Sequence, residues 1–456
     1  MSLFGKGVPV RYNFQEYMVV KNKVILALTA LSSLSITMPA SAANIILRDT
    51  NGSFASQGAR GQAALFAFQK AANFWNRTLN NDVTINIEIG FAQLGPRIIA
   101  QAGSSTAISD VGTIYNRLRA NSATALDAVA TANLFPLNSD GTLKFITNAS
   151  LAAANNGGII GGGADPNRTI LDDNSTNNNF FFEVSNANLR TLGIDFSDGD
   201  ILRQCSTTFI AADSCITFSS ELNFDFDPTD GIDIGATDFT GAAIHEIGHA
   251  LGFISGVDLN DFVAGNPDLF GDVPLDDVAL LSVYDLFRYG SNFDPVTGQR
   301  LLQLAANRPA FFSINGQTAF NSENSDVAEA TNLSTGEAVG DGFQASHFKD
   351  NISRLDDTGL CRISERQIGI LDPTAARCEV LTVTANDLAV LDAIGYNLNF
   401  NLLENPGFTF NTAQVFGLGG LAAVPEPATW AMMIVGFGFA GATARRRRSK
   451  VQVTYA

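Results

Sequence analysis

The sequence predicts a mixed α+β fold, and two helix patterns and one strand pattern support this prediction. Residues 60 to 80 read as an amphipathic helix, because large apolar side chains recur on one face: Leu65, Phe68, Trp75 and Leu79. A strand pattern follows at once, in which apolar and polar residues alternate from Val83 to Ile89. Residues 239 to 251 are apolar on most of their surface, which is typical of a helix buried at the centre of a domain. Together these patterns predict helices and strands in one domain, with a buried helix at its centre.

The other expected elements lie between and after these three. Asn- and Gly-rich runs between residues 150 and 180 predict loops. A second alternating strand is expected over residues 216 to 224. As an edge strand it would bind an extended peptide, and otherwise it is an ordinary core strand. A long, mostly irregular segment is expected up to about residue 345. The last helix begins at Thr384, where Thr-Ala-Asn-Asp forms a capping box, and Gly395 is placed to end it.

The composition is that of a globular chain. Of the 456 residues, 46% are hydrophobic and 16% are charged, which is far from the composition of disordered proteins. The formal net charge of -17 argues against nucleic acid as a partner. The sequence gives no indication of the oligomeric state.

Residues 1 to 43 have the layout of a signal peptide. Lys21 and Lys23 precede an apolar run, and the small residues from Ala40 to Ala43 provide an A-x-A cleavage site. A short buried helix is the alternative, but the charged flank and the small-residue exit favour export. The folded domain is therefore expected over residues 44 to 404.

The C-terminus carries a second membrane signal, after a linker predicted over residues 405 to 423. Val424-Pro-Glu-Pro leads into an apolar stretch of about 17 residues, which is close to the shortest length that crosses a bilayer. The arginines from Arg445 to Arg448 follow and would stay in the cytoplasm. Residues 424 to 448 closely resemble the PEP-CTERM sorting signal of Gram-negative bacteria. This resemblance implies recognition by an exosortase and display on, or release from, the cell surface. A plain membrane anchor is the alternative.

Four cysteines fit an oxidising compartment. Cys205 and Cys215 are close in sequence, as are Cys361 and Cys378, so two local disulfides are expected. Other pairings are open from sequence alone, and the spacings are not those of a zinc ribbon.

Residues 245 to 249 read His-Glu-Ile-Gly-His, the motif that carries the predicted chemistry. On a helix, His245 and His249 lie on one face, one turn apart, where two imidazoles can hold one zinc ion. Glu246 then lies beside the metal, where it can take a proton from a water molecule whose pKa the zinc lowers. Burial of these side chains without a metal would be costly, which argues against an ordinary pair of surface histidines.

The residues after this motif resemble the metzincin consensus, in which a glycine and a third histidine follow. Gly252 matches the glycine, but Ser255 stands where the third histidine is expected. Leishmanolysin-like metzincins supply that histidine from beyond a long insertion, in a Ser-His context similar to that of His347. The resemblance therefore implies His347, the last of 3 histidines in the chain, as the third ligand, with an insertion over residues 255 to 343. Asp258 is the alternative ligand, because carboxylates also bind zinc.

A further resemblance to metzincins lies downstream. The sequence Gly369-Ile-Leu-Asp-Pro resembles the methionine turn below the metal, with Leu371 in place of methionine. Because that turn is a hydrophobic floor and not a ligand, leucine is a volume-conserving replacement. The resemblance implies a zincin-like fold. Its upper subdomain holds a twisted sheet with the central catalytic helix and ends near residue 254, and an irregular lower subdomain covers residues 344 to 404. Substrate would lie in the cleft between them.

Two weaker signals concern calcium and an oxyanion. Four carboxylates just before the central helix offer hard oxygen ligands for Ca²⁺: Asp225, Asp227, Asp230 and Asp233. Their spacing does not match an EF-hand, and turn and cap roles are favoured. Three tyrosines could donate a hydrogen bond to an oxyanion, but structural roles are expected for them: Tyr284, Tyr289 and Tyr396.

Together these features predict an exported zinc-dependent endopeptidase that acts on a protein or peptide substrate. The alternative is a catalytically inactive surface or matrix protein stabilised by zinc, or an adhesin. The intact Glu246 argues against this alternative, because a structural zinc site needs no base.

Overall fold

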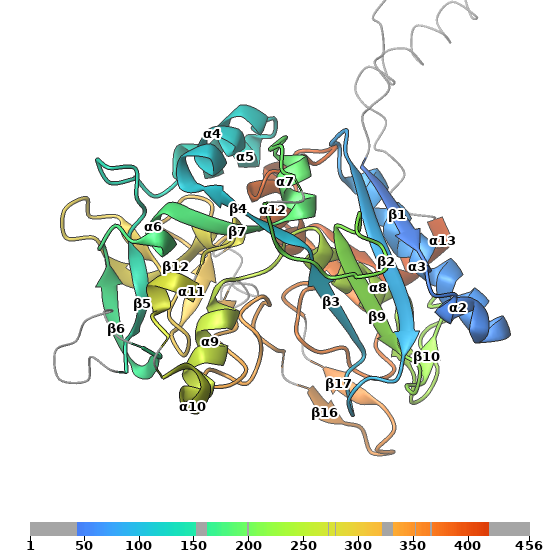
Figure 1. The fold of residues 1–456 in the computed structure, drawn as a ribbon. Coiled ribbons are helices and arrows are strands. Elements are labelled where there is room, and N and C mark those ends of the chain that lie inside the picture. The colour runs from blue at the N-terminus through green and yellow to red at the C-terminus, as the bar shows by residue number, and fades with distance from the viewer. Residues whose placement is uncertain are drawn as a thin grey trace, which may run out of the picture. The chain divides into compact units, whose positions relative to one another are not determined.

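The computed structural model describes residues 43–151, 162–197, 200–271, 273–278, 280–321, 332–351, 353–364 and 367–418. These residues form a mixture of helices and several small sheets, which confirms the predicted α+β class (Figure 1). Except for Ala43, the predicted signal peptide lies outside the described residues, and so does the C-terminal sorting tail. Within the described part of the chain, every helix is too short or too polar to cross a bilayer.

The main sheet has four strands in the order β1 (Asn44–Arg48), β2 (Thr84–Ala92), β9 (Ser214–Ser219) and β3 (Ala100–Ser104). The first three run parallel, whereas β3 pairs antiparallel with β9. The strand predicted over residues 216 to 224 is therefore an interior strand that ends at Ser219, and the edge-strand alternative was wrong. The edge is β3, whose sequence, Ala-Gln-Ala-Gly-Ser, has no large apolar residue to signal a strand.

Two helices, α3 (Gly58–Thr78) and α8 (Phe239–Ala250), pack against each other beside this sheet. The ring N–H of Trp75 donates to the carbonyl of Ile244 at 3.1 Å, and the rings of Phe218 and Phe239 lie 4.3 Å apart. Each such buried ring contributes roughly 1.5–3 kcal/mol of hydrophobic stabilisation. Both helices agree with the sequence prediction. The short helix α2 (Ser53–Ser56) links β1 to α3.

The chain between β3 and β9 adds two small sheets and several helices. One sheet has the order β7 (Phe181–Ser185), β4 (Thr106–Asp110), β8 (Ile201–Arg203), and the other pairs β5 (Phe145–Ala149) with β6 (Asp165–Asp172). The helices are α4 (Val111–Asn121), α5 (Ala125–Ala132), α6 (Asn177–Phe180) and α7 (Asn186–Thr191). The loops predicted between residues 150 and 180 thus contain β6 and α6. They are stabilised by polar contacts, because the buried Asp172 carboxylate accepts hydrogen bonds from Asn178 and Asn179.

The predicted insertion is more regular than expected. It contains α9 (Val257–Gly265), α10 (Pro267–Phe270), α11 (Leu275–Val278) and a 3-10 turn, η1 (Tyr284–Phe287). A four-stranded sheet follows, in the order β13 (Arg300–Leu302), β12 (Arg288–Phe293), β14 (Ala310–Phe312), β15 (Asn332–Leu333). Three of these strands have only two or three residues, and β12 contains a glycine followed by polar residues, so the sequence alone does not reveal them.

The C-terminal part returns to the α3–α8 core. A hairpin of β16 (Ser353–Leu355) and β17 (Arg362–Ser364) precedes β18 (Thr382–Thr384) and α12 (Ala385–Ala393). The capping box at Thr384 is present, and Gly395 has a φ of 108°, as expected for a residue that ends a helix. Two short strands, β10 (Phe224–Asp225) and β11 (Thr237–Asp238), pair just before α8.

The predicted linker begins too early. After η2 (Leu402–Glu404), β19 (Thr409–Asn411) pairs with β18, and α13 (Thr412–Leu418) packs on α3. Phe410 and Val415 are buried in these contacts, which explains why residues 409 to 418 belong to the fold.

Candidate active site

Helix α8 presents His245, Glu246 and His249. Asp238 caps the helix, since its carboxylate accepts the N–H of Gly241 at 2.9 Å. The helix ends at Ala250, and Gly252 follows with a φ of 114°, a conformation that favours glycine. The chain therefore turns sharply after the second histidine, at the glycine that matches the consensus.

The structure brings His347 next to these two histidines. The Nε2 atom of His249 lies 3.0 Å from that of His245 and 3.0 Å from that of His347, and the third Nε2–Nε2 distance is 3.2 Å. These side chains form a group that could hold a metal ion, with His347 buried and the two helical histidines half-buried. Two nitrogens bound tetrahedrally about 2.0–2.1 Å from one zinc lie about 3.3–3.4 Å apart, close to the distances observed here.

The partners of the opposite ring nitrogens determine which tautomer each imidazole adopts. The Nδ1 atoms of His245 and His249 each lie 2.7 Å from a backbone carbonyl oxygen, that of Ile370 and of Phe253 respectively. The Nδ1 of His347 lies 3.2 Å from the carbonyl oxygen of Gln344. Because a carbonyl oxygen only accepts, each Nδ1 carries the hydrogen and each neutral ring directs a lone pair from Nε2 to the same point. Three converging lone pairs repel one another unless a cation lies between them, so this donor set fits a metal ion.

Burial keeps the three rings neutral. It lowers the pKa of His245 to about 3, with a further contribution from the neighbouring His249, and it lowers the pKa of His249 to about 4. Burial also holds the pKa of His347 well below its usual range. Neutral imidazole is the form that binds metals.

Glu246 directly follows His245 on helix α8. Its side chain is 7% exposed, and no described residue donates a hydrogen bond to its carboxylate. Burial raises the pKa of Glu246 to about 8, and a cation nearby would lower it. Burial of a carboxylate without a hydrogen-bond partner destabilises the fold. Such destabilising burial is common for groups that act in catalysis or binding.

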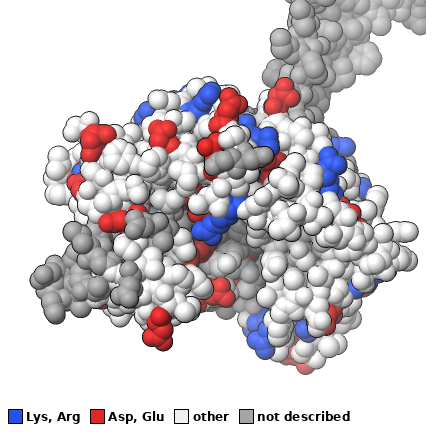
Figure 2. Space-filling model, in the orientation of Figure 1, with Lys and Arg blue, Asp and Glu red and all other residues white. Residues whose placement is uncertain are grey.

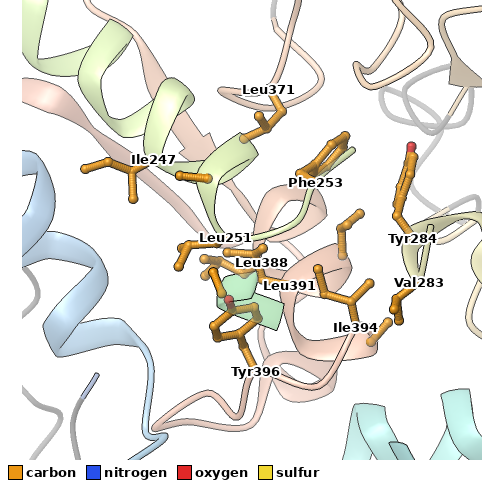
Figure 3. Close-up of a cluster of buried hydrophobic side chains, with 14 of the residues drawn as sticks. Ile247, Leu251, Phe253, Val283, Tyr284, Leu371, Leu388, Leu391, Ile394 and Tyr396 are labelled. Carbon is orange, nitrogen blue, oxygen red and sulfur yellow. The ribbon is translucent and has the colours of Figure 1, made fainter. Parts of the chain in front are cut away.

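The turn that resembles a methionine turn is hydrogen-bonded to His245 and to the residue after His347. The carbonyl of Ile370 accepts from His245, and the carbonyl of Leu371 accepts the N–H of Phe348, the residue after His347, at 3.0 Å. The side chain of Leu371 points toward the last turn of α8 (Figure 3), where a Cβ on Gly248 would lie 3.0 Å from it. The turn thus forms an apolar floor against the helix.

A buried carboxylate that the sequence did not single out holds this turn in place. Asp387, on α12, accepts the N–H groups of Ile370 at 2.9 Å and of Leu371 at 3.0 Å. Gly369 allows this approach, because a Cβ there would lie 2.3 Å from the carboxylate. Asp387 is recognisable from sequence as the last residue of the capping box, but its bonds to the turn depend on contacts between segments far apart in the chain.

Both predicted disulfides are present. Cys205 is bonded to Cys215, and Cys361 to Cys378. Cys361 and Cys378 flank the segment that contains the turn, and the N–H of Cys378 donates to the carbonyl of Ala236 just before α8. The second disulfide therefore joins the C-terminal hairpin to the approach of the central helix.

The other candidates do not join the histidines. Asp258 is not part of the metal-binding group, because its carboxylate accepts hydrogen bonds from Ala345 and Ser346. Asp225 accepts the N–H groups of Asp227 and Asp233, which is the hydrogen bonding of a turn-forming aspartate. The three tyrosines considered for the oxyanion are all buried within the core: Tyr284, Tyr289 and Tyr396.

Comparisons with known proteins identify the C-terminal tail. Residues 423–448 match the PEP-CTERM protein-sorting motif. This motif implies export and membrane anchoring or sorting through the C-terminus in a Gram-negative bacterium, with recognition by an exosortase-type enzyme. Searches of curated proteins and of solved structures found no significant match to the chain.

Proposed function

We propose that this chain is an exported zinc-dependent endopeptidase. The observation that carries the proposal is the convergence of three unprotonated imidazole nitrogens beside Glu246, a buried carboxylate to which no described residue donates. Three protein ligands leave a fourth position open on a tetrahedral ion, which is typical of catalytic zinc and not of structural zinc.

The residues of the site suggest how the reaction would proceed. His245, His249 and His347 would hold the metal. When bound, zinc supplies a Lewis acid that polarises the scissile carbonyl and lowers the pKa of an adjacent water molecule. Glu246 would take a proton from the attacking water and then deliver it to the nitrogen of the leaving amine. Both carboxylate oxygens are available for this transfer, because no other described residue bonds them.

The arrangement of the sheet supports a zincin-like fold with a peptide substrate. Strand β3 lies against α8 and pairs with β9 on one side only among the described strands. An extended peptide would add to the free side of β3 through backbone hydrogen bonds and lie across the histidines. Acidic and basic side chains are interspersed on the face shown in Figure 2, so a large patch of one charge does not restrict the substrate there.

Substitution of the base separates the protease from an inactive zinc protein. Glu246→Gln keeps the size of the side chain but removes its basicity, so peptide hydrolysis should fall by about 100-fold or more. Zinc content, measured by metal analysis, should stay at one ion per chain. Glu404→Gln, an exposed glutamate in η2, is the matched control and should cleave a broad peptide library like the wild type.

Two results would contradict the proposal in different ways. A wild type that binds zinc but is as inert as Glu246→Gln on the library is the zinc-stabilised surface protein. A wild type that binds no divalent ion in the presence of excess zinc has no metal centre at all.

A further inference from the structure

The two ends of the long insertion meet beside the candidate metal site. The N–H of Ser255, where the third histidine of the consensus would stand, donates to the hydroxyl oxygen of Ser346 at 2.9 Å. Ser346 directly precedes His347. The chain therefore leaves the active site at Ser255 and returns to that point, so that the base of the insertion determines where His347 lies.

Asp258, a half-buried aspartate on the first turn of α9, binds the segment that returns to the active site. Asp258 accepts the N–H of Ala345 at 2.5 Å and the hydroxyl of Ser346. These are the two residues immediately before His347. Charge-assisted hydrogen bonds of this kind are among the stronger ones in proteins, so the backbone before the ligand has little freedom to move.

Two buried groups complete the base of the insertion. Asp285 accepts the hydroxyl of Ser255 at 2.6 Å and the N–H of Gly256 at 2.8 Å, which fixes the start of the insertion. The fully buried guanidinium of Arg288 donates to the carbonyl of Ala345 at 3.3 Å, which fixes the segment before His347. Arg288 also donates to the carbonyl of Ser334 at 2.7 Å. The positive charge of Arg288 offsets the carboxylates of Asp258 and Asp285.

We propose that Asp258 is a positioning residue that holds His347 in the geometry required for metal binding. The sequence suggested Asp258 as a substitute ligand, whereas both of its hydrogen bonds go to the backbone and side chain beside the ligand. This proposal rests on the proposed zinc site. A residue that fixes a ligand in advance reduces the ordering cost of metal binding, and loss of such outer partners typically lowers metal affinity about 10–100-fold.

Helix α9 provides a matched control for the experiment. Asp261 lies one turn after Asp258, is buried, and like Asp258 accepts two hydrogen bonds, from the N–H groups of Ala338 at 2.7 Å and of Val339 at 2.9 Å. These contacts lie within the insertion and not beside His347. Asp258→Asn and Asp261→Asn therefore make the same chemical change at the base and in the interior of the insertion.

The test measures zinc affinity by chelator competition and amide exchange in the metal-free protein. We expect Asp258→Asn to weaken zinc binding by about 10–100-fold and to speed exchange in the peptide that contains residues 344 to 348. Asp261→Asn should speed exchange near residue 338 while leaving zinc affinity within about 2-fold of the wild type. Ser346→Ala, which removes one donor, should reduce affinity less than Asp258→Asn.

Unchanged zinc affinity in Asp258→Asn would overturn the proposal. Equal losses of zinc affinity in Asp258→Asn and Asp261→Asn would also overturn it, because they would indicate general destabilisation. The exchange measurement requires no metal. A wild type that binds no zinc would overturn the proposed function, whatever the exchange result. Unchanged exchange before His347 in Asp258→Asn would overturn the positioning role by itself.

Discussion

Asp387→Asn is the most direct test of how the floor of the site is held. The side chain is fully buried and accepts three backbone N–H groups, from Thr384 at 2.7 Å, Ile370 at 2.9 Å and Leu371 at 3.0 Å. Burial raises the pKa of Asp387 to about 6, so the group is ionised at pH 8. Asparagine has nearly the same shape, but it is neutral and has only one acceptor oxygen.

The expected loss follows from this geometry. If the amide oxygen faces Thr384 and Ile370, the amide nitrogen faces the N–H of Leu371, and one donor is left without a partner. The N–H left without a partner costs about 1–3 kcal/mol, and the loss of a buried charge whose pKa is raised recovers part of this cost, so we expect the free energy of unfolding to fall by about 1–2 kcal/mol. The side chain cannot shift to relieve the contact, because Gly369 is closely packed against it.

The substitution should also weaken the metal site. The carbonyl of Ile370 orients His245, so a looser turn should reduce zinc affinity by about 10-fold. Urea denaturation at pH 8 measures the stability, and chelator competition measures the affinity. Asp268→Asn, an exposed aspartate on α10, serves as the control. Wild-type values for both quantities in Asp387→Asn would refute the reasoning.

Three other predictions follow from the same structure. His347→Ala removes one of three converging nitrogens and should lower zinc affinity by about 100-fold or more, and unchanged metal content at limiting zinc would rule out His347 as a ligand. Gly248→Ala places a methyl group 3.0 Å from Leu371 and should cost about 1–2 kcal/mol of stability, because crowding outweighs the gain in helix propensity. In a Leu371→Ala background the same methyl group should be harmless. An equal cost in both backgrounds would show that this contact is not responsible. Asp392→Asn should stabilise the protein at pH 8 by about 1–3 kcal/mol, since burial and the charge of Asp127 raise the pKa of Asp392, and burial raises that of Asp127. Because the folded-state pKa values of both aspartates lie above the unfolded value of 3.8, the wild type loses stability as the pH rises from about 4. The melting temperatures of the wild type and Asp392→Asn should therefore converge near pH 4. Parallel pH profiles of the two proteins would contradict this explanation.

Local patterns predicted the elements that surround the site. Helices α3 and α8 and strand β2 follow from apolar periodicity, and α12 follows from its capping box and terminal glycine. The two disulfides join cysteines that are close in sequence. His347 could be singled out because the chain has only 3 histidines, and the structure places it beside the other two.

The features that sequence reasoning missed depend on contacts between distant segments. Strand β3 has small side chains and is a strand only because β9 pairs with it. The strands of the insertion are short and pair across loops of varied length. The sequence marks Asp258 only as a substitute ligand and Asp387 only as a capping-box residue, because their hydrogen bonds to residues 345 and 371 depend on the tertiary fold.

The disulfide between Cys361 and Cys378 encloses the turn beneath the histidines. Because thiols stay reduced in the bacterial cytoplasm, a chain that is still inside the cell would lack this covalent link and gain it only after translocation. For the proposed endopeptidase, a site completed by oxidation outside the membrane would pose little threat to the proteins of the cell that made it.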